Sequence, residues 1–219
     1  MTTRADFLAR IRDALGRRAE GTPIPPPPTD IDTARTVPRS ATDLPARFAT
    51  AAAAVGMTVH RSGAADLESC LAAILRAAGA RRVALALTPG MHRLAAESAA
   101  RAAGADILPP PSSPGFEPHY DADASITDVA GAIAETGSLV IASGPHAPRA
   151  AFLVPPVHIA IVREDQILPD LADFFPTLAP DTLPASLVLI TGPSKTADIE
   201  GILITGAHGP REVHAVLTA

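Results

Sequence analysis

A glutamate stands beside a glycine within an otherwise apolar part of the chain, in the segment Ala134-Glu135-Thr136-Gly137-Ser138. A carboxylate among apolar neighbours loses hydration, which makes Glu135 a candidate general base or nucleophile. Thr136 and Gly137 belong to the same turn and are candidates for ligand binding. The structural alternative is that Glu135 caps backbone amides in a turn that Gly137 makes possible. The residues alone leave both interpretations open.

A second polar loop follows the apolar run 187–190 and reads Thr191-Gly192-Pro193-Ser194-Lys195-Thr196. Its hydroxyl groups, its cation and the backbone amides of an expected helix could converge on an anion. The ligand-binding candidates in this loop are Gly192, Ser194, Lys195 and Thr196. The loop is not a Walker A motif, because that motif needs glycine where this chain has Ser194 and Leu189.

Two carboxylates, Asp198 and Glu200, follow this loop directly. In a first helical turn they compete with an anion for the positive end of the helix. On a helix they point about 200° apart, whereas on a strand they would share a face. We therefore expect one of them at most to face a ligand in a helix, with Asp198 as a catalytic candidate and Glu200 as a ligand-binding candidate. Alternatively, Ser194 or Thr196 simply caps the helix.

A histidine lies in a glycine-rich turn, Gly206-Ala207-His208-Gly209-Pro210. Because histidine titrates near neutral pH, His208 suits a proton-transfer partner for Glu135 or Asp198. Gly209 is a ligand-binding candidate in the same turn. The structural alternative is an ordinary exposed histidine in a loop.

His158 falls inside an apolar run of strand length and is included among the ligand-binding candidates. Its default interpretation is a buried histidine that hydrogen-bonds to a neighbouring polar group. The acidic and histidine side chains show no paired-histidine or cysteine spacing, so we expect no metal site and no bound cofactor.

These polar segments lie between alternating helical and strand-like stretches, which predicts an α/β domain with a largely parallel sheet flanked by helices. Ligands in such sheets bind beyond the carboxyl ends of the strands, and we expect both polar loops there. The expected helices cover 44–55, 66–78 and 92–103, and a helix or turn is expected over 129–134. The expected strands cover 57–60, 82–87, 124–127, 138–142, 157–162, 187–190 and, as an edge strand, 212–217.

The first segment of the chain predicts an amphipathic helix, because Phe7, Leu8 and Ile11 recur at helical spacing over 5–18. A polyproline run at 23–28 follows and is typical of an extended spacer. The predicted organisation is a helical arm over 1–22, a proline-rich linker over 23–44 and an α/β domain over 45–219. The arm either packs on its own domain or on a second copy, or docks a partner protein.

Composition excludes several classes of protein. A net charge of -5 argues against nucleic acid as the main partner, because phosphate binding needs a basic surface. The single cysteine, Cys70, cannot form an intramolecular disulfide or hold an iron–sulfur cluster alone. No run approaches the roughly 18 apolar residues of a membrane span, and the polar start is unlike a signal peptide. We expect a cytoplasmic protein.

Four segments in fixed order, 133–140, 155–159, 192–200 and 206–210, resemble the lactate utilization protein C family, also called the LUD-domain family. The resemblance implies a fold similar to the sugar-isomerase and coenzyme A transferase group. It further implies iron–sulfur or redox subunits as partners, which together with the C-type member oxidise L-lactate to pyruvate. In the transferases a glutamate near a comparable strand attacks the acyl group, so Glu135 is the first catalytic candidate by analogy of fold.

Three hypotheses follow. The chain is a component of L-lactate oxidation that binds a small carboxylate, acyl or other anionic ligand at the two polar loops. Alternatively, it is a non-catalytic assembly subunit that docks the redox partners, or an independent enzyme acting on a phosphorylated or coenzyme A-linked substrate. The sequence leaves open whether the chain forms a homo-oligomer.

Overall fold

The structure is a computed structural model that describes residues 3–14, 35–38, 40–109, 119–144, 146–179, 181, 183–196 and 204–219. The chain divides into two compact units, Met1–Arg35 and Thr36–Ala219. The predicted proline-rich spacer lies outside the described residues. Within the second unit, Val37 is already buried, so packing begins before the predicted start of the domain.

Helix α1 (Arg4–Ala14) is the described element of the first unit. Thr3 and Asp6 cap its start reciprocally: the Thr3 amide donates to the Asp6 carboxylate at 3.0 Å, and the Asp6 amide donates to the Thr3 hydroxyl at 3.2 Å. No residue of α1 is buried, and Phe7 and Ile11 are exposed on it. The expected helix therefore forms over the described part of this segment.

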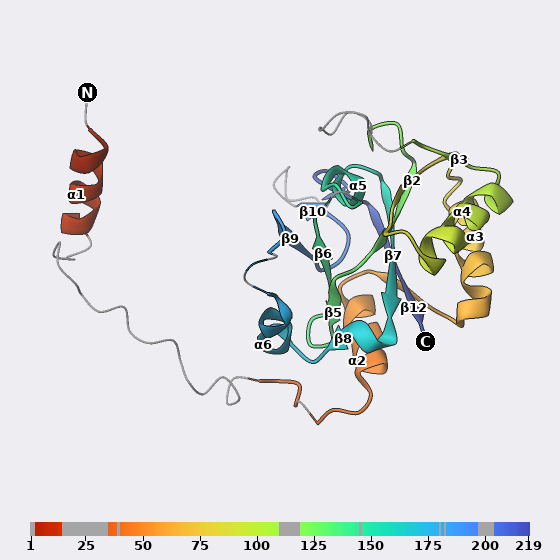
Figure 1. The fold of residues 1–219 in the computed structure, drawn as a ribbon, viewed down its shortest axis with the longest axis horizontal. Helices are drawn as coiled ribbons and strands as arrows, with labels where there is room; N and C mark the ends of the chain where they lie inside the picture. The colour runs from red at the N-terminus through yellow and green to blue at the C-terminus, as the bar shows by residue number, and fades with distance from the viewer. Residues whose placement is uncertain are drawn as a thin grey trace. The chain divides into compact units, whose positions relative to one another are not determined.

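Six parallel strands form the main sheet of the second unit (Figure 1). Most of them are apolar and buried on both faces, as parallel sheets require. In spatial order they are β1 (Thr58–Ser62), β12 (Glu212–Thr218), β7 (Val157–Arg163), β4 (Ala124–Asp128), β2 (Arg82–Ala86) and β3 (Asp106–Ile107).

Two helices, α3 (Leu67–Ala77) and α4 (Met91–Ala103), lie side by side against one face of this sheet (Figure 1). Leu71 and Leu75 of α3 are fully buried there, and α4 turns a row of alanines toward the same core. Small side chains let a helix approach its neighbours closely, which compensates for the low aromatic content of the chain. A short 3-10 turn, η2 (Ala64–Asp66), leads into α3.

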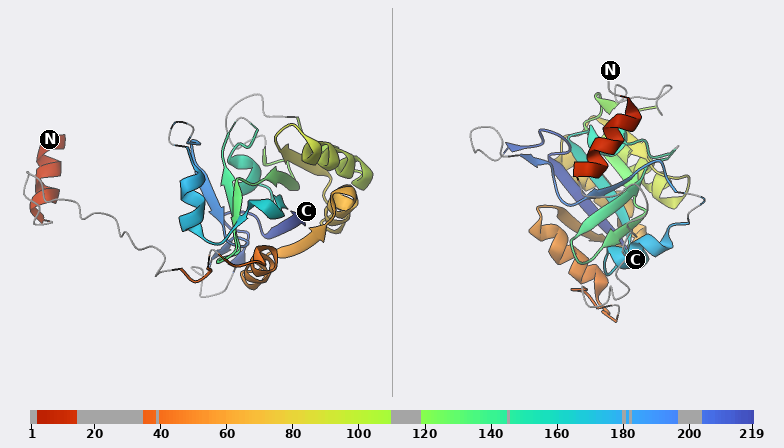
Figure 2. Two further views of the ribbon diagram at one scale, coloured as in Figure 1. Left: turned by 60° about the horizontal axis from the view of Figure 1, so that its bottom comes forward. Right: turned by 90° about the vertical axis from the view of Figure 1, so that its left-hand side faces the viewer.

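A smaller mixed sheet packs over the opposite face, in the order β8 (Ile167–Leu168), β5 (Gly131–Ile133), β6 (Ser138–Ala142) and β9 (Leu187–Ile190). Helices α2 (Leu44–Ala54) and α5 (Ala150–Leu153) contribute Phe48 and Phe152 to the core between the sheets. The first view in Figure 2 shows α3 and α4 on one side of the unit and β9 on the other. The remaining elements are η4 (Glu164–Gln166), α6 (Leu171–Phe174), η5 (Phe175–Thr177), β10 (Lys195–Thr196) and β11 (Ile204–Thr205).

The predicted α/β class is confirmed, and so are the three helices and most strands of the second unit. The prediction of a helix or turn over 129–134 is wrong, because residues Gly131–Ile133 form β5. Ala132 and Ile133 are fully buried there, and β5 pairs antiparallel with β6 and parallel with β8. A strand of three residues is too short to show the alternation of apolar and polar residues by which a strand is recognised in a sequence.

Two further expectations need correction. The last strand, β12, is not an edge strand, because it pairs with β1 on one side and β7 on the other. Its polar residue His214 lies inside the sheet, where its imidazole meets that of His60 at 3.1 Å. The prediction of a helix after Ser194 is also wrong at its first two residues. Lys195 and Thr196 form β10, which pairs antiparallel with β11.

Candidate functional site

Glu135 lies in the turn between β5 and β6, where its side chain is exposed. Its amide donates to the carbonyl of Pro169 at 3.0 Å, and the Thr36 hydroxyl donates to its carboxylate. The expectation that the Glu135 carboxylate has apolar surroundings is therefore wrong, because the turn places this carboxylate outside the buried sheet. The carboxylate is accessible to a ligand and keeps its hydration.

A chain of hydroxyl groups connects the two polar loops. Thr136 Oγ1 lies 2.7 Å from Ser138 Oγ, which in turn lies 2.7 Å from Thr191 Oγ1. Ser138 is only 2% exposed, so each of its neighbours supplies a hydrogen bond that water cannot. The expectation that these loops lie together is met at this point, since β6 and β9 pair with Leu139 opposite Ile190.

Two glycines hold both loops against the C-terminal half of α2. Gly137 has a φ of +68°, and a Cβ there would overlap the backbone of Ala51 and Ala52. Gly192 has a φ of +99°, and a Cβ there would lie 2.5 Å from the carbonyl oxygen of Val55. Only glycine tolerates both the backbone conformation and the close approach. Their positions therefore favour a structural role for each glycine.

Lys195 lies at the C-terminal end of the same helix, with Nζ 3.4 Å from the Val55 carbonyl oxygen. A cation is stabilised there by the helix dipole. The Lys195 side chain is exposed and Thr196 is half-buried. The cation thus has one structural contact and remains open to solvent.

Ser194 connects this loop to the histidine turn. Its hydroxyl accepts the His208 amide at 3.2 Å, and its own amide donates to the Pro210 carbonyl at 2.9 Å. The His208 side chain is exposed, and Gly209 lies beside Ser194. These residues are therefore brought together by the fold.

The remaining candidates are Asp198, Glu200 and His158. Asp198 and Glu200 lie outside the described residues. His158 is fully buried in β7, and burial together with His214 lowers its pKa to about 3. Its Nε2 lies 2.9 Å from the hydroxyl of Thr127, as expected for a buried histidine with a polar neighbour. A neutral, enclosed imidazole suits a core position.

The second loop lies at the amino ends of the parallel strands, not at their carboxyl ends as expected. Ser194 contacts His208 and Pro210 in the turn before β12, and Lys195 contacts Val55 between α2 and β1. The carboxyl edge instead holds Thr88 and Asp128, which were not among the residues predicted from the sequence. The sequence did contain a signal for them, because Thr88 and Asp128 each directly follow a predicted strand.

Within the described part of the chain, no group of three or more His, Cys, Asp or Glu side chains could hold a metal ion. Among those same residues, no helix is long and apolar enough to cross a membrane.

The family model described as "LUD domain" matches residues 45–218, and the chain belongs to this family. Lactate utilization protein C of Deinococcus radiodurans is 36% identical over 98 residues, which are 44% of this chain and 46% of that protein. The protein of the same name from Bacillus subtilis is 34% identical over 92 residues, which are 40% and 38% of the two chains. The matched segment thus spans less than half of these curated relatives.

A solved structure agrees with this assignment. The crystal structure of a DUF162 family protein from Deinococcus radiodurans superposes with a TM-score of 0.61 at 25% identity, covering 80% of this chain and 96% of that one. The family resemblance inferred from the four sequence segments is confirmed.

Proposed function

We propose that the chain acts in lactate utilization and binds a small carboxylate, acyl or other anionic ligand at the surface formed by its two polar loops. The observation that carries the proposal is the hydroxyl chain from Thr136 through Ser138 to Thr191, which fixes one loop against the other. The names of the family relatives support the role in lactate utilization.

The exposed groups at this surface have complementary chemistry. Lys195 offers a cation within reach of solvent, and the Thr136 hydroxyl offers a neutral hydrogen-bonding group. Glu135 would act as general base or nucleophile on a bound acyl group, with His208 as its proton-transfer partner. Both of these side chains are exposed.

Thermal unfolding of the full chain with L-lactate, pyruvate, phosphosugars and acyl-coenzyme A compounds tests the binding. A ligand present at about 100 times its dissociation constant adds about 2.7 kcal/mol of stability. Lys195→Gln should abolish that stabilisation, while Arg211→Gln, an exposed cation paired with Glu212, should preserve it. Absence of stabilisation by every compound contradicts the proposal.

The compound that stabilises the chain also separates two of the hypotheses. Stabilisation by a phosphosugar or an acyl-coenzyme A compound, with none by lactate or pyruvate, favours an independent enzyme on that substrate. Glu135→Gln then tests the chemistry, because lactate-dependent turnover of the assembled system should fall if Glu135 reacts and should persist if it only accepts the Thr36 hydroxyl.

A second candidate function is that of an assembly subunit that docks iron–sulfur redox partners. It is favoured by α1, whose Phe7 is 58% exposed and which buries no residue. Deletion of residues 1–28 should then abolish co-purification with the redox subunits and leave the ligand response intact. Unchanged co-purification and unchanged oligomeric state contradict a docking arm.

A further inference from the structure

The main sheet has a point at which its connections reverse direction. From β2 the chain runs through α4 to β3 on one side, whereas from β4 it continues to β7 on the other side. Beyond the carboxyl ends of two such neighbouring strands a crevice opens, and ligands of open α/β sheets bind there. In this chain the reversal lies between β2 and β4, which pair directly.

A fixed carboxylate stands at this point. Asp128 is the last residue of β4, and its Oδ2 accepts hydrogen bonds from the Thr88 amide at 2.8 Å and the Thr88 hydroxyl at 2.6 Å. Two donors from one residue hold the carboxylate in a single orientation. Its side chain is 27% exposed, so this fixed group faces accessible space.

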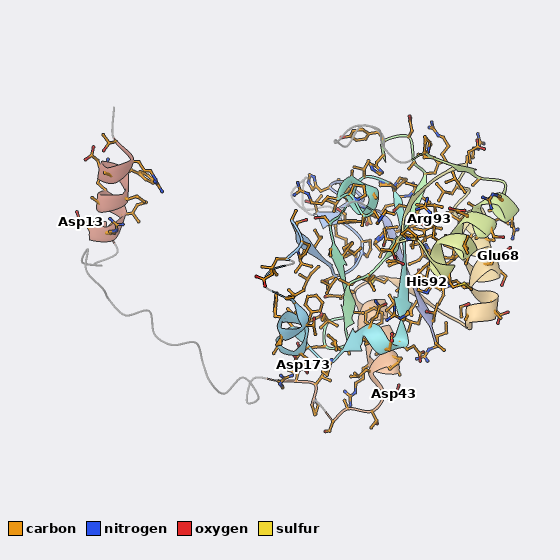
Figure 3. All side chains as sticks on the ribbon, viewed as in Figure 1. Asp13, Asp43, Glu68, His92, Arg93 and Asp173 are labelled. Atoms are coloured by element: carbon orange, nitrogen blue, oxygen red, sulfur yellow. The ribbon has the colours of Figure 1, made fainter. Side chains whose placement is uncertain are left out.

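His92 approaches the other oxygen of the same carboxylate. Its Nδ1 lies 3.4 Å from Asp128 Oδ1, and Figure 3 labels the residue in the first turn of α4. A carboxylate at Nδ1 favours the tautomer with the proton on that nitrogen, which leaves Nε2 as an acceptor. Among the described residues, no hydrogen bond occupies Nε2.

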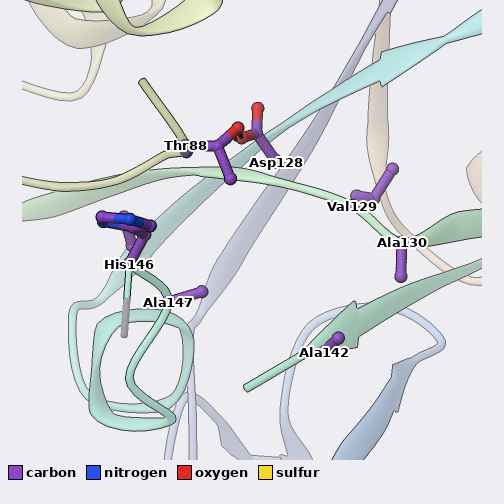
Figure 4. Close-up of a pocket in the computed structure, with 8 residues that line it drawn as sticks. Thr88, Asp128, Val129, Ala130, Ala142, His146 and Ala147 are labelled. Atoms are coloured by element: carbon purple, nitrogen blue, oxygen red, sulfur yellow. Dashed lines mark hydrogen bonds between the residues drawn. The ribbon is translucent and has the colours of Figure 1, made fainter. Parts of the chain in front are cut away.

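Thr88 belongs to the walls of two adjoining pockets. One has a volume of 170 Å³ and includes Asp128 and His146 in its lining, and Figure 4 shows the His146 loop facing the Thr88–Asp128 pair. The other has a volume of 280 Å³ and is lined by Thr88, Gly90, Met91, His92 and Arg163. Both are smaller than pockets for drug-sized molecules, so they suit a compact ligand.

Arg163 supplies positive charge to the larger pocket. It ends β7, the strand beside β4, and binds Asp165 through Nε at 2.9 Å and Nη2 at 3.2 Å. These hydrogen bonds raise the pKa of Arg163. The remaining nitrogen, Nη1, donates to no acceptor among the described residues and can bind an oxyanion.

We infer that this crevice binds a small hydroxylated oxyanion, a carboxylate or a phosphate, with Arg163 contacting the anionic group and His92 accepting a hydrogen bond from the hydroxyl group of the ligand. Asp128 is a positioning residue, because it acts through His92. The site is distinct from the two polar loops. It adjoins Ala142 at one end of β6, whereas Ser138 lies at the other end, about 13 Å away for a strand of this length.

Matched ligand pairs test the inference by calorimetry on the full chain. L-lactate and propionate differ in one hydroxyl group, as do 1,2-propanediol 1-phosphate and propyl phosphate. In one of the two pairs the hydroxylated member should bind about tenfold more tightly, and that pair identifies the anion as carboxylate or phosphate. Equal affinity within both pairs, or no binding of either, overturns the inference.

Variants assign the roles. Arg163→Gln should weaken both members of the responding pair about tenfold, and Arg61→Gln, an exposed strand arginine paired with Glu164, should change neither. His92→Phe and Asp128→Asn should remove the preference for the hydroxylated member and retain binding of the other one. A preference that survives both substitutions overturns the assignment of His92.

The same titrations separate this site from the proposed function. If Lys195→Gln abolishes binding and Arg163→Gln leaves it unchanged, the ligand occupies the polar loops and the inference of a crevice site fails. The opposite pattern supports the crevice and contradicts ligand binding at the loops.

Discussion

Asp123 and Asp128 fasten the two ends of β4 to β2. The Asp123 carboxylate accepts the amides of Arg81 and Arg82, both at 2.9 Å, where β2 begins. The Asp128 carboxylate accepts the amide and the hydroxyl of Thr88 just after β2 ends. The strand pair beside the reversal of the sheet is thus held at both edges by charge-assisted hydrogen bonds, which are stronger than neutral ones.

Asp123→Asn and Asp128→Asn should each destabilise the fold by about 1–3 kcal/mol, because each replaces a charged acceptor by a neutral one. Urea unfolding at neutral pH measures the change. The two variants should differ in ligand binding and not in stability, since only Asp128 lies at the crevice. If Asp123→Asn also weakened ligand binding strongly, both carboxylates would affect binding by holding β4 and β2 in position.

Gly137→Ala should destabilise the protein more than Gly79→Ala. Both positions have a positive φ, +68° and +63°, so the strain of the backbone is common to both variants. Only at Gly137 does the added Cβ meet the backbone of α2, whereas nothing lies within 4 Å of it at Gly79. We expect the difference in unfolding free energy to be about 2 kcal/mol. Equal losses would mean that α2 moves away without cost.

Much of the fold could be predicted because its main sheet is built from apolar runs bounded by turn residues. The run that forms β7 is long, apolar and buried at all but one position, and such runs identify strands of a parallel sheet. The strand β5 could not be found, since its three residues follow β4 after only two others. The central place of β12 comes from its pairing with β1 and β7, which lie far from it in the sequence, and no local pattern reveals this pairing.

The candidate site was predicted in part. Loops that carry unusual polar residues were found, and Thr136, Ser138 and Thr191 do meet. Sequence reasoning placed the second loop at the wrong edge of the main sheet, because no local pattern shows that β9 belongs to the smaller sheet. Once the order of the strands is known, the reversal between β2 and β4 singles out Thr88 and Asp128.

Ser138→Ala should cost about 1–2 kcal/mol of stability, because it leaves the hydroxyls of Thr136 and Thr191 without their shared partner. Thr136→Val serves as the control, since it leaves the Ser138 hydroxyl its contact to Thr191. Urea unfolding of both variants measures the difference. Equal effects would indicate that the hydroxyl chain does not hold the two loops together.

Stability should fall as the pH is lowered through the mildly acidic range, because of buried histidines. Burial lowers the pKa of His158 to about 3 from an ordinary value of 6.5, and burial also lowers the pKa of His60 and His214. Between the folded and the unfolded pKa the unfolded chain binds more protons, so stability rises with pH there. The contribution of His158 is complete above pH 6.5 and is lost progressively down to about pH 3.

From pH 7 to about pH 5, His158 alone should reduce the unfolding free energy by about 2 kcal/mol. Urea unfolding at a series of pH values measures the slope, and His158→Gln should flatten it, because glutamine does not titrate and can still bond the Thr127 hydroxyl. His60→Gln should flatten it less, since its imidazole is only partly buried. A slope that is unchanged in His158→Gln would show that other groups control the acid response.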